Sequence, residues 1–276
     1  MSENTSGESN SLLKRWVTGL ILAPVLVLIV VFGSKEIFAA LVIFFIMGGV
    51  WEYNHMVFGK GFVKEKIEGL ILAVMIPLSV LLGNSQHLLA ILSFSVLIVF
   101  MLFVLSIKEA EFDVLSVAKV IFGMMYIPFL MSYFISLRIM DKGIEWIFFV
   151  LFLAFIGDIF ALYAGKHFGK HKLAPFVSPG KTVEGLAGLV LGSTSACLIF
   201  SYYFLPEIPV TQIIILAFTG SIIGQLGDIC ESAVKRNYGL KDAGSILPGH
   251  GGILDRLDCL LFIAPFVYYY RMFIIG

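Results

Sequence analysis

The amino-acid sequence predicts an all-α polytopic integral membrane protein with about nine transmembrane helices. Two observations lead to this class. Of the 276 residues, 59% are hydrophobic and only 14% are charged, with a mean hydropathy of +0.98. Apolar runs of about 20 residues, the length that crosses a bilayer as a helix, recur along the chain. Soluble globular domains do not have this composition, and the sequence lacks the short alternating strands of a membrane β-barrel.

Short polar or glycine-bearing linkers separate the predicted spans. A polar tail at 1–15 precedes the first apolar run, which is longer than a signal-peptide core and has no small-residue cleavage site, so we expect it to remain attached. Five spans fill residues 16–137 and four fill residues 138–276. The spans are predicted at 16–33, 37–54, 67–83, 87–107, 117–137, 144–165, 183–204, 210–234 and 253–275.

The distribution of basic residues predicts the orientation. The net charge is zero, but with a cytoplasmic N-terminus fourteen of the 19 Lys and Arg residues lie in cytoplasmic segments. Arg256 stands at the cytoplasmic start of the last span, and the exceptions on the outer side are Lys35, Arg138, Lys142 and Arg271. This positive-inside bias favours a cytoplasmic N-terminus and an odd number of spans.

The cytoplasmic loop 166–182 contains a candidate anion site. Its segment Ser178-Pro179-Gly180-Lys181-Thr182 resembles the end of a Walker A loop, but Pro175 stands where that motif needs its first glycine, and no strand is predicted before it. We expect a turn followed by a helix that begins near Thr182. Free N–H groups at a helix start, next to Lys181, favour anion binding. The alternative is an interfacial anchor at the helix start.

The loop 235–252 is flanked by polar stripes. Spacings of three and four residues place side chains on one helix face. One stripe ends the eighth span, the other begins the ninth, and the loop brings both to the cytoplasmic side. Their members are Gln225, Asp228, Glu231, Ser232 and Lys235 in the first stripe, and Asp255 and Asp258 in the second.

Carboxylates beside lipid are costly unless a partner compensates their charge. A divalent cation is the simplest partner, and Mg²⁺ prefers carboxylate oxygens, with phosphate and water completing its shell. Asp228, Asp255 and Asp258 are therefore candidate Mg²⁺ ligands. The alternative is local pairing, such as Asp255 with Arg256 or Lys235. A zinc site is not favoured, because the three cysteines have no ligand spacing and are interpreted as reduced core residues.

Basic and glycine residues of the loop 235–252 are candidate phosphate ligands. Four of its side chains can bind phosphate groups: Lys235, Arg236, Lys241 and His250. The glycines of the segment 248–252 allow backbone N–H groups to approach a ligand, or the chain to turn tightly into the ninth span. A turn alone does not explain the adjoining histidine and the Asp-Arg-Leu-Asp sequence.

Other charged residues near span ends are interpreted more simply. Glu52 and Glu68 each stand alone, and we expect them to be solvated or paired edge residues. Asp158 near the end of the sixth span and Glu184 at the start of the seventh flank the basic loops. The histidines outside the loop 235–252 are expected to be interfacial; they are His55, His87, His167 and His171.

The motifs together resemble those of the phosphatidate cytidylyltransferases (CDP-diacylglycerol synthases). The resemblance rests on Ser232-x2-Lys235-Arg236-x4-Lys241-Asp242 and on Leu247-Pro248-x-His250-Gly251-Gly252-x2-Asp255-Arg256-x-Asp258. The segments Ser178-Pro179-Gly180-Lys181-Thr182-x-Glu184-Gly185 and Gly227-Asp228-x2-Glu231-Ser232 are also similar. Motifs cover residues 150–260, and the first half matches by hydropathy alone. The apolar residues 159–162 depart from the small polar residues common in the family, which leaves Asp158 alone in that segment.

The resemblance implies transfer of the cytidylyl group of CTP to phosphatidic acid, giving CDP-diacylglycerol and pyrophosphate in phospholipid biosynthesis. It also implies dependence on Mg²⁺, a place for a second cation, and a homodimer. We expect an integral protein of the cell inner membrane, with residues 138–276 as its catalytic part and the active site on the cytoplasmic side. No nucleic-acid partner is expected.

The expected roles divide into three groups. The catalytic residues are Asp228, Asp255 and Asp258, which would hold the metal, together with Lys235, His250 and Arg256. The substrate-binding residues are Ser178, Lys181, Ser232, Arg236, Lys241, Gly251 and Gly252. Supporting residues around them are Asp158, Glu184, Gln225 and Glu231.

Two rival functions remain open from the sequence. A cation- or proton-coupled transporter also carries intramembrane acids, but its sites lie near the midplane, whereas these acids gather near one face. Another lipid-phosphate transferase is the second rival. A CDP-alcohol phosphotransferase is expected to carry an Asp-Gly-x2-Ala-Arg segment, which this sequence lacks.

Overall fold

The computed structural model describes residues 23–83, 85–107, 113–246 and 251–276, most of which are helical. The chain divides into two compact units. The first consists of Met1–Met124 with Asp242–Arg256, and the second of Met125–Lys241 with Leu257–Gly276. The predicted tail 1–15 and part of the first predicted span lie outside the described residues.

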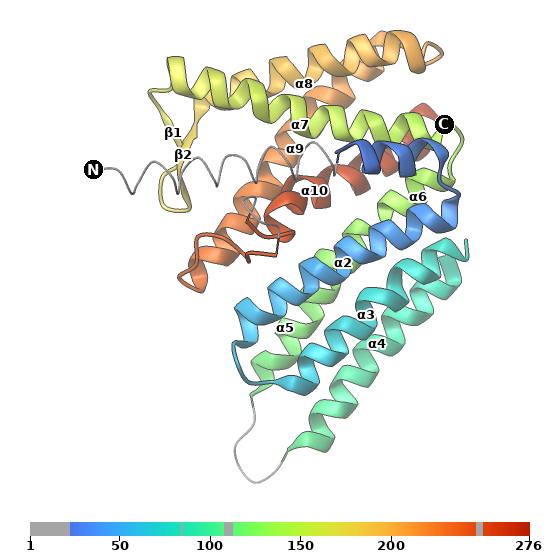
Figure 1. Ribbon diagram of the computed structural model, residues 1–276, viewed down its shortest axis with the longest axis vertical. Coiled ribbons are helices and arrows are strands. Elements are labelled where there is room, and N and C mark those ends of the chain that lie inside the picture. The colour runs from blue at the N-terminus through green and yellow to red at the C-terminus, as the bar shows by residue number, and fades with distance from the viewer. Residues whose placement is uncertain (1–22, 84, 108–112, 247–250) are drawn as a thin grey trace. The chain divides into compact units, whose positions relative to one another are not determined.

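The first unit is a helical bundle. After a short helix, Ala23–Phe32, it contains α2 (Lys35–Phe58), α3 (Val63–Leu81), α4 (Ser85–Ser106) and α5 (Val114–Met124). Helix α3 packs against α2, α4 and α5 (Figure 1). Polar groups of α2 fasten its neighbours: the hydroxyl of Tyr53 donates to the carbonyl of Lys119 in α5 at 2.9 Å, and Asn54 Nδ2 donates to the carbonyl of Lys66 in α3 at 3.1 Å.

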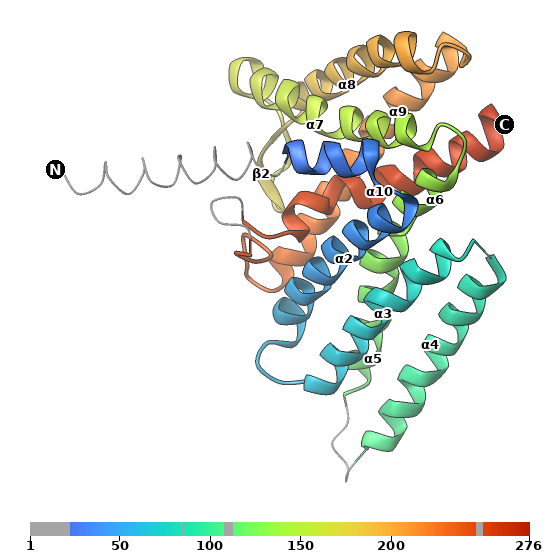
Figure 2. The same ribbon diagram turned by 45° about the vertical axis from the view of Figure 1, so that its right-hand side comes forward.

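The second unit contains the remaining helices and one hairpin. Its elements are η1 (Met125–Phe129), α6 (Tyr133–Ile139), α7 (Gly143–Phe168), β1 (Lys172–Ala174), β2 (Ser178–Thr182), α8 (Val183–Phe204), α9 (Val210–Asn237), α10 (Leu254–Tyr270, from Leu257 onward) and η2 (Arg271–Ile275). Helices α7 and α8 lie side by side in two views (Figures 1 and 2). Small residues permit this close approach, since a methyl group on Gly157 would stand 2.2 Å from the Ser193 hydroxyl.

The helices confirm the predicted class of membrane protein. Seven described helices are long and apolar enough to cross a bilayer. The predicted spans from 37–54 onward coincide with helices to within a few residues. One predicted span corresponds to α3, which is not among the seven helices that could cross a bilayer. Its first turn contains the charged run Lys64-Glu65-Lys66. The total of nine spans and the cytoplasmic N-terminus stay predictions.

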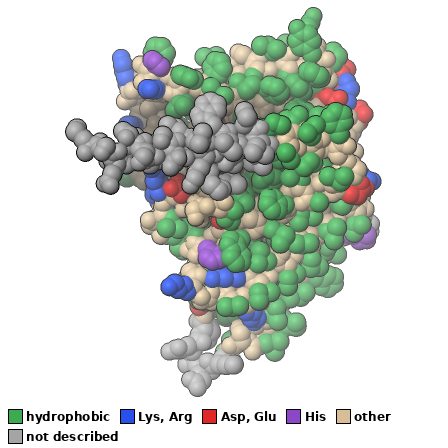
Figure 3. Space-filling view, in the orientation of Figure 1, with side chains coloured by type: hydrophobic (Ala, Val, Ile, Leu, Met, Phe, Trp, Pro, Cys, Tyr) green, Lys and Arg blue, Asp and Glu red, His purple; other side chains and the backbone are tan. Residues whose placement is uncertain are grey.

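The outer faces of the helices are apolar. Figure 3 shows hydrophobic side chains spread widely over the visible face. Helix α4 is an example, because Phe94, Leu97 and Val104 are all mainly exposed. In water such a surface would drive aggregation, whereas in hydrocarbon it costs nothing. Burial in lipid therefore accounts for side chains that no protein neighbour covers.

The hairpin between α7 and α8 corrects a prediction. The segment Ser178–Thr182, predicted as a turn, forms strand β2, and strand β1 precedes it. The two strands are antiparallel, with Lys172 opposite Thr182 and Ala174 opposite Ser178. Pairing satisfies backbone groups that short, irregular loops would leave to water. The predicted helix start is confirmed: Thr182 caps α8, its hydroxyl accepting from the N–H of Gly185 at 3.0 Å.

Candidate active site

The hairpin of the second unit brings a lysine to an aspartate of α9. Lys181, near the end of β2, forms an ion pair with Asp228. Both side chains are largely covered, with 19% of Lys181 and 31% of Asp228 exposed. Partial burial strengthens such a pair relative to one in open water. A residue predicted to bind substrate and a residue predicted to bind metal are therefore partners.

The hairpin is anchored through Glu184 in the first turn of α8. Its carboxylate accepts from the backbone N–H of Lys170 at 3.0 Å, from that of His171 at 3.2 Å, and lies 2.7 Å from His171 Nδ1. Across the hairpin, Lys172 Nζ donates to the carbonyl of Pro179 at 2.8 Å. Glu184, predicted as a supporting residue, thus holds the start of the hairpin that carries Lys181.

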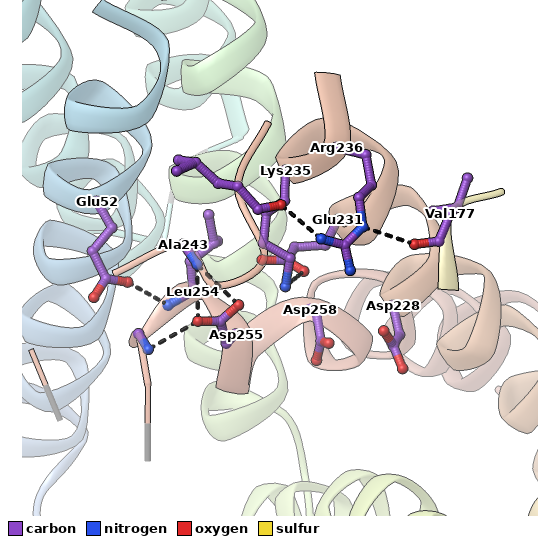
Figure 4. A network of polar contacts seen from close by, with 12 residues as sticks. Glu52, Val177, Asp228, Glu231, Lys235, Arg236, Ala243, Leu254, Asp255 and Asp258 are labelled. Carbon is purple, nitrogen blue, oxygen red and sulfur yellow. Dashed lines mark hydrogen bonds and ion pairs between the residues drawn. The ribbon is translucent and has the colours of Figure 1, made fainter. Parts of the chain in front are cut away.

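The end of α9 contributes two basic side chains whose local partners are defined (Figure 4). Arg236 Nε donates to the carbonyl of Val177 at 3.1 Å, and one terminal nitrogen donates to the carbonyl of Leu240 at 2.9 Å. Lys235 pairs with Glu231 one turn earlier, and both are almost fully buried. Because Arg has five N–H donors, Arg236 retains donors beyond these two contacts.

Asp228 also lines a crevice among the helices of the second unit. Asp158 from α7 and Gln225 from α9 line it too, so three predicted residues meet there. The remaining lining residues are Leu153, Ala154, Leu189, Ser221, Gly224, Cys259 and Ile263. Cys259 and Cys197 are buried as expected, whereas Cys230 is exposed, which corrects its interpretation as a core residue.

Helices α9 and α10 nearly touch next to Asp258. A methyl group on Gly227 would stand 2.7 Å from the carbonyl oxygen of Asp258, so only glycine permits this approach. Asp258 Oδ1 accepts from the N–H of Cys259 at 2.7 Å. Its neighbour Cys259 lines the same crevice as Asp158 and Asp228. Acidic side chains from three helices of this unit are therefore gathered together.

The donor set of this cluster is compatible with Mg²⁺. Within the described residues, no group of three or more His, Cys, Asp or Glu side chains forms a ready metal site. Mg²⁺ does not require one, because it is commonly held by one or two carboxylates while substrate phosphates and water complete its shell. Oxygen donors beside buried lysines match that chemistry, whereas among the described residues that line the crevice Cys259 is the one soft donor of the kind that zinc prefers.

In the first unit, Asp255 makes backbone contacts. Its carboxylate accepts from the N–H of Ala243 at 3.0 Å and from that of Gly252 at 2.9 Å (Figure 4). Asp255 therefore ties together the two ends of the segment 243–252. The sequence predicts a metal ligand here and gives no sign of these contacts, because Ala243 lies twelve residues away. A carboxylate has about four acceptor sites, so a metal role stays a prediction.

Glu52 lies in a different environment from the one that its sequence predicts. It was expected to be a solvated or paired edge residue, but only 2% of it is exposed. Its Oε2 accepts from the N–H of Leu254 at 2.9 Å, across 202 residues of sequence. The one available signal was a lone glutamate in an apolar helix. That signal does not identify a partner so distant along the chain.

The other predicted residues occupy varied settings. Ser232 is buried in α9, Ser178 begins β2, and Lys241 and Arg256 are exposed. Gly251 has a φ of 81°, a conformation that only glycine adopts without strain. His250 lies outside the described residues.

Comparison with known proteins identifies relatives. The model of the cytidylyltransferase family matches residues 13–274. A phosphatidate cytidylyltransferase of Bacillus subtilis (strain 168) is 41% identical over 177 residues, which is 64% of this chain and 65% of that protein. Phosphatidate cytidylyltransferases of Staphylococcus epidermidis (strain ATCC 12228) and Staphylococcus aureus (strain COL) are each 39% identical over 160 residues, 58% of either chain. The matched region thus spans less than two thirds of these relatives.

Proposed function

Because the chain belongs to the cytidylyltransferase family, we propose that it transfers the cytidylyl group of CTP to phosphatidic acid, forming CDP-diacylglycerol and pyrophosphate. The name of its relatives, phosphatidate cytidylyltransferase, supports this choice of substrates. The observation that carries the proposal is the meeting of Asp158, Asp228 and Asp258 with Lys181 in a protein built from membrane-spanning helices.

The proposed reaction is a substitution at phosphorus. A phosphate oxygen of phosphatidic acid attacks the α-phosphorus of CTP, the bond from that phosphorus to the β-phosphate breaks, and pyrophosphate leaves. The attacking phosphate is already anionic near neutral pH, so no strong base is required. The barrier is mainly electrostatic, since two polyanions must meet, and such transfers depend on positioning and charge neutralisation.

We propose Asp228, Asp255 and Asp258 as the residues that would hold Mg²⁺, with a place for a second cation beside them. Asp255 precedes Asp258 by three residues in α10. When bound, Mg²⁺ would neutralise phosphate charge and stabilise the leaving group. The carboxylates contribute oxygen ligands, and the orientation of Asp228 depends on its pairing with Lys181.

Lysines of the second unit would then bind phosphate oxygens. Lys181 pairs with Asp228 and Lys235 pairs with Glu231, so each ammonium group is held near the proposed phosphate site until substrate binds. Additional phosphate contacts are proposed for other basic, hydroxyl and glycine residues. These are Arg236, Lys241, His250, Arg256, Ser178, Ser232, and the glycine pair Gly251-Gly252, in which the N–H of Gly252 already donates to Asp255.

Four residues would act by supporting these groups. Glu184 holds the hairpin, Glu231 orients Lys235, and Asp158 and Gln225 line the crevice beside Asp228. We also propose, from the charge bias and the resemblance, a homodimer of the inner membrane whose site faces the cytoplasm. CTP is cytosolic and the acceptor is a lipid, so a site at the membrane surface would reach both.

The test is product formation by the purified protein in detergent. Labelled CTP, phosphatidic acid and Mg²⁺ are supplied together and with each omitted in turn. We expect CDP-diacylglycerol and pyrophosphate only when all three are present, and we expect chelation by EDTA to abolish turnover. Full activity under chelation would remove the Mg²⁺ assignment alone. Absence of product from a folded protein under all conditions would overturn the transferase assignment.

A further inference from the structure

Glu52 is an acid of helix α2 that the proposed reaction does not use. Its side chain is 98% buried within the first unit, where an unpartnered charge would be very costly. Within the part of the chain that the structure describes, it forms no ion pair with a basic residue. Backbone N–H groups stabilise it instead: Leu254 donates at 2.9 Å, and the backbone of Ile246 and Ile253 also faces it.

Two glycines surround the same carboxylate. A methyl group on Gly244 would stand 2.3 Å from Glu52 Oε1, and one on Gly252 would stand 2.6 Å from Oε2. Neither glycine has a positive φ, so close approach is the reason for their lack of a side chain. One carboxylate therefore touches the segment 244–254 near its beginning and at its end.

Asp255 holds the same segment from within. It accepts from Ala243 and Gly252, whereas Glu52 reaches Gly244, Gly252 and Leu254 from α2 (Figure 4). Asp255 joins Ala243 to Gly252, and Glu52 ties these residues to a helix nearly 200 residues earlier. Ile253 reinforces the attachment, since its side chain fits against Gly48 of α2.

We infer that Glu52 is a positioning residue that holds residues 243–246 and 251–254 against helix α2. The inference rests on the proposed function to the extent that this segment supplies phosphate-binding groups of the CTP site. A carboxylate cannot itself bind phosphate, because both are anionic acceptors. Glu52 acts instead by fixing the backbone at Gly252 and the start of α10, and thereby the groups that meet the nucleotide.

The test compares Glu52→Ala and Glu52→Gln, with Glu68→Gln as the control. Glu68 is a half-buried carboxylate of α3 in the same unit, and it lines a separate crevice with Lys64 and Ser116. Hydrogen exchange of the peptide covering residues 241–257 reports the clamp directly, independent of activity. Kinetics at varied CTP and varied phosphatidic acid report its consequence.

In Glu52→Ala, we expect the amides of this peptide to exchange about 10-fold faster, because a buried charge-assisted hydrogen bond is lost. We expect kcat/KM for CTP to fall about 10-fold to 100-fold, with KM for phosphatidic acid nearly unchanged. Glu52→Gln keeps an acceptor oxygen and should restore part of both. Glu68→Gln should change neither.

Gly244→Ala provides a second route if Glu52→Ala does not fold, because the added methyl group pushes the segment away from an intact Glu52. Unchanged exchange in residues 241–257 for the folded variants would overturn the inference. Equal acceleration in α8 would also overturn it, since the effect would then be general destabilisation. Faster exchange confined to the segment, in a protein whose wild type forms no CDP-diacylglycerol, would retain the clamp and reject the proposed function.

Discussion

Two acids of the first unit and two acids of the second unit are stabilised by different partners. In the first unit, Glu52 and Asp255 accept hydrogen bonds from backbone N–H groups of a loop. In the second unit, Asp228 and Glu231 pair with the ammonium groups of Lys181 and Lys235. A backbone donor is fixed by the fold, whereas a lysine ammonium stands on a flexible stem. Glu52 and Asp255 therefore fix the backbone of a loop. Lys181 and Lys235 can instead turn from their acidic partners to a phosphate.

The largest expected effect comes from removing a charge in the second unit without altering its packing. Asp258→Asn keeps the acceptor oxygen that binds the N–H of Cys259, so folding should be retained. We expect kcat to fall at least about 100-fold, because charge stabilisation at the transferred phosphate is lost. Turnover and the melting temperature of purified protein measure the two effects. Near-normal turnover would contradict the metal assignment of Asp258.

Removing a lysine from the same unit should have a somewhat smaller effect. Lys181→Ala leaves Asp228 without its ammonium partner and removes a proposed phosphate ligand. We expect kcat/KM for CTP to fall about 10-fold to 100-fold. Lys142→Ala, which removes the lysine of an exposed ion pair with Glu207, is the matched control. If both substitutions reduced activity equally, the distinction between site lysines and surface lysines would fail.

A substitution in the second unit that changes packing but no charge should reduce the stability of the protein. Gly227→Ala places a methyl group 2.7 Å from the carbonyl oxygen of Asp258, and backbone cannot easily move away. We expect a loss of about 1–3 kcal/mol in unfolding free energy, seen as a lower melting temperature in detergent. Gly180→Ala should melt like the wild type, because its added methyl group would meet no non-adjacent residue within 4 Å. An unchanged melting temperature for Gly227→Ala would contradict the close packing of α9 against α10.

The smallest expected effect concerns the exposed pair between Lys142 and Glu207, joined at 2.7 Å. The hydrogen bond from Lys142 lowers the pKa of the Glu207 carboxyl. The ion pair therefore stabilises the protein at pH values above the ordinary pKa of glutamate. This stabilisation is lost as the pH falls through the lowered pKa of Glu207. Glu207→Gln should cost less than about 1 kcal/mol at neutral pH and nothing in acid. Melting curves at several pH values measure this, and a larger loss in acid would reverse the assignment.

Local pattern was sufficient to predict most of the helices. Hydropathy and span length place α7, α8 and α9 within a few residues of their bounds, because a membrane-crossing helix must satisfy its own backbone and face lipid with apolar side chains. Thr182 at the start of α8 follows from capping chemistry. The spacing of Asp228, Glu231 and Lys235 likewise predicts a shared helix face, on which Glu231 pairs with Lys235.

Long-range contacts were beyond that pattern. The pairing of Lys181 with Asp228 depends on a β-hairpin whose short strands have no distinctive alternation. Glu52 has the same local sequence whether it faces water or the backbone of Leu254. The sequence by itself determined the membrane-spanning class, the helix bounds and the grouping of charges at helix ends, since these depend on neighbours within a few turns. Only the tertiary structure decided which partner each buried acid has, because that choice is made by packing between segments far apart in the chain.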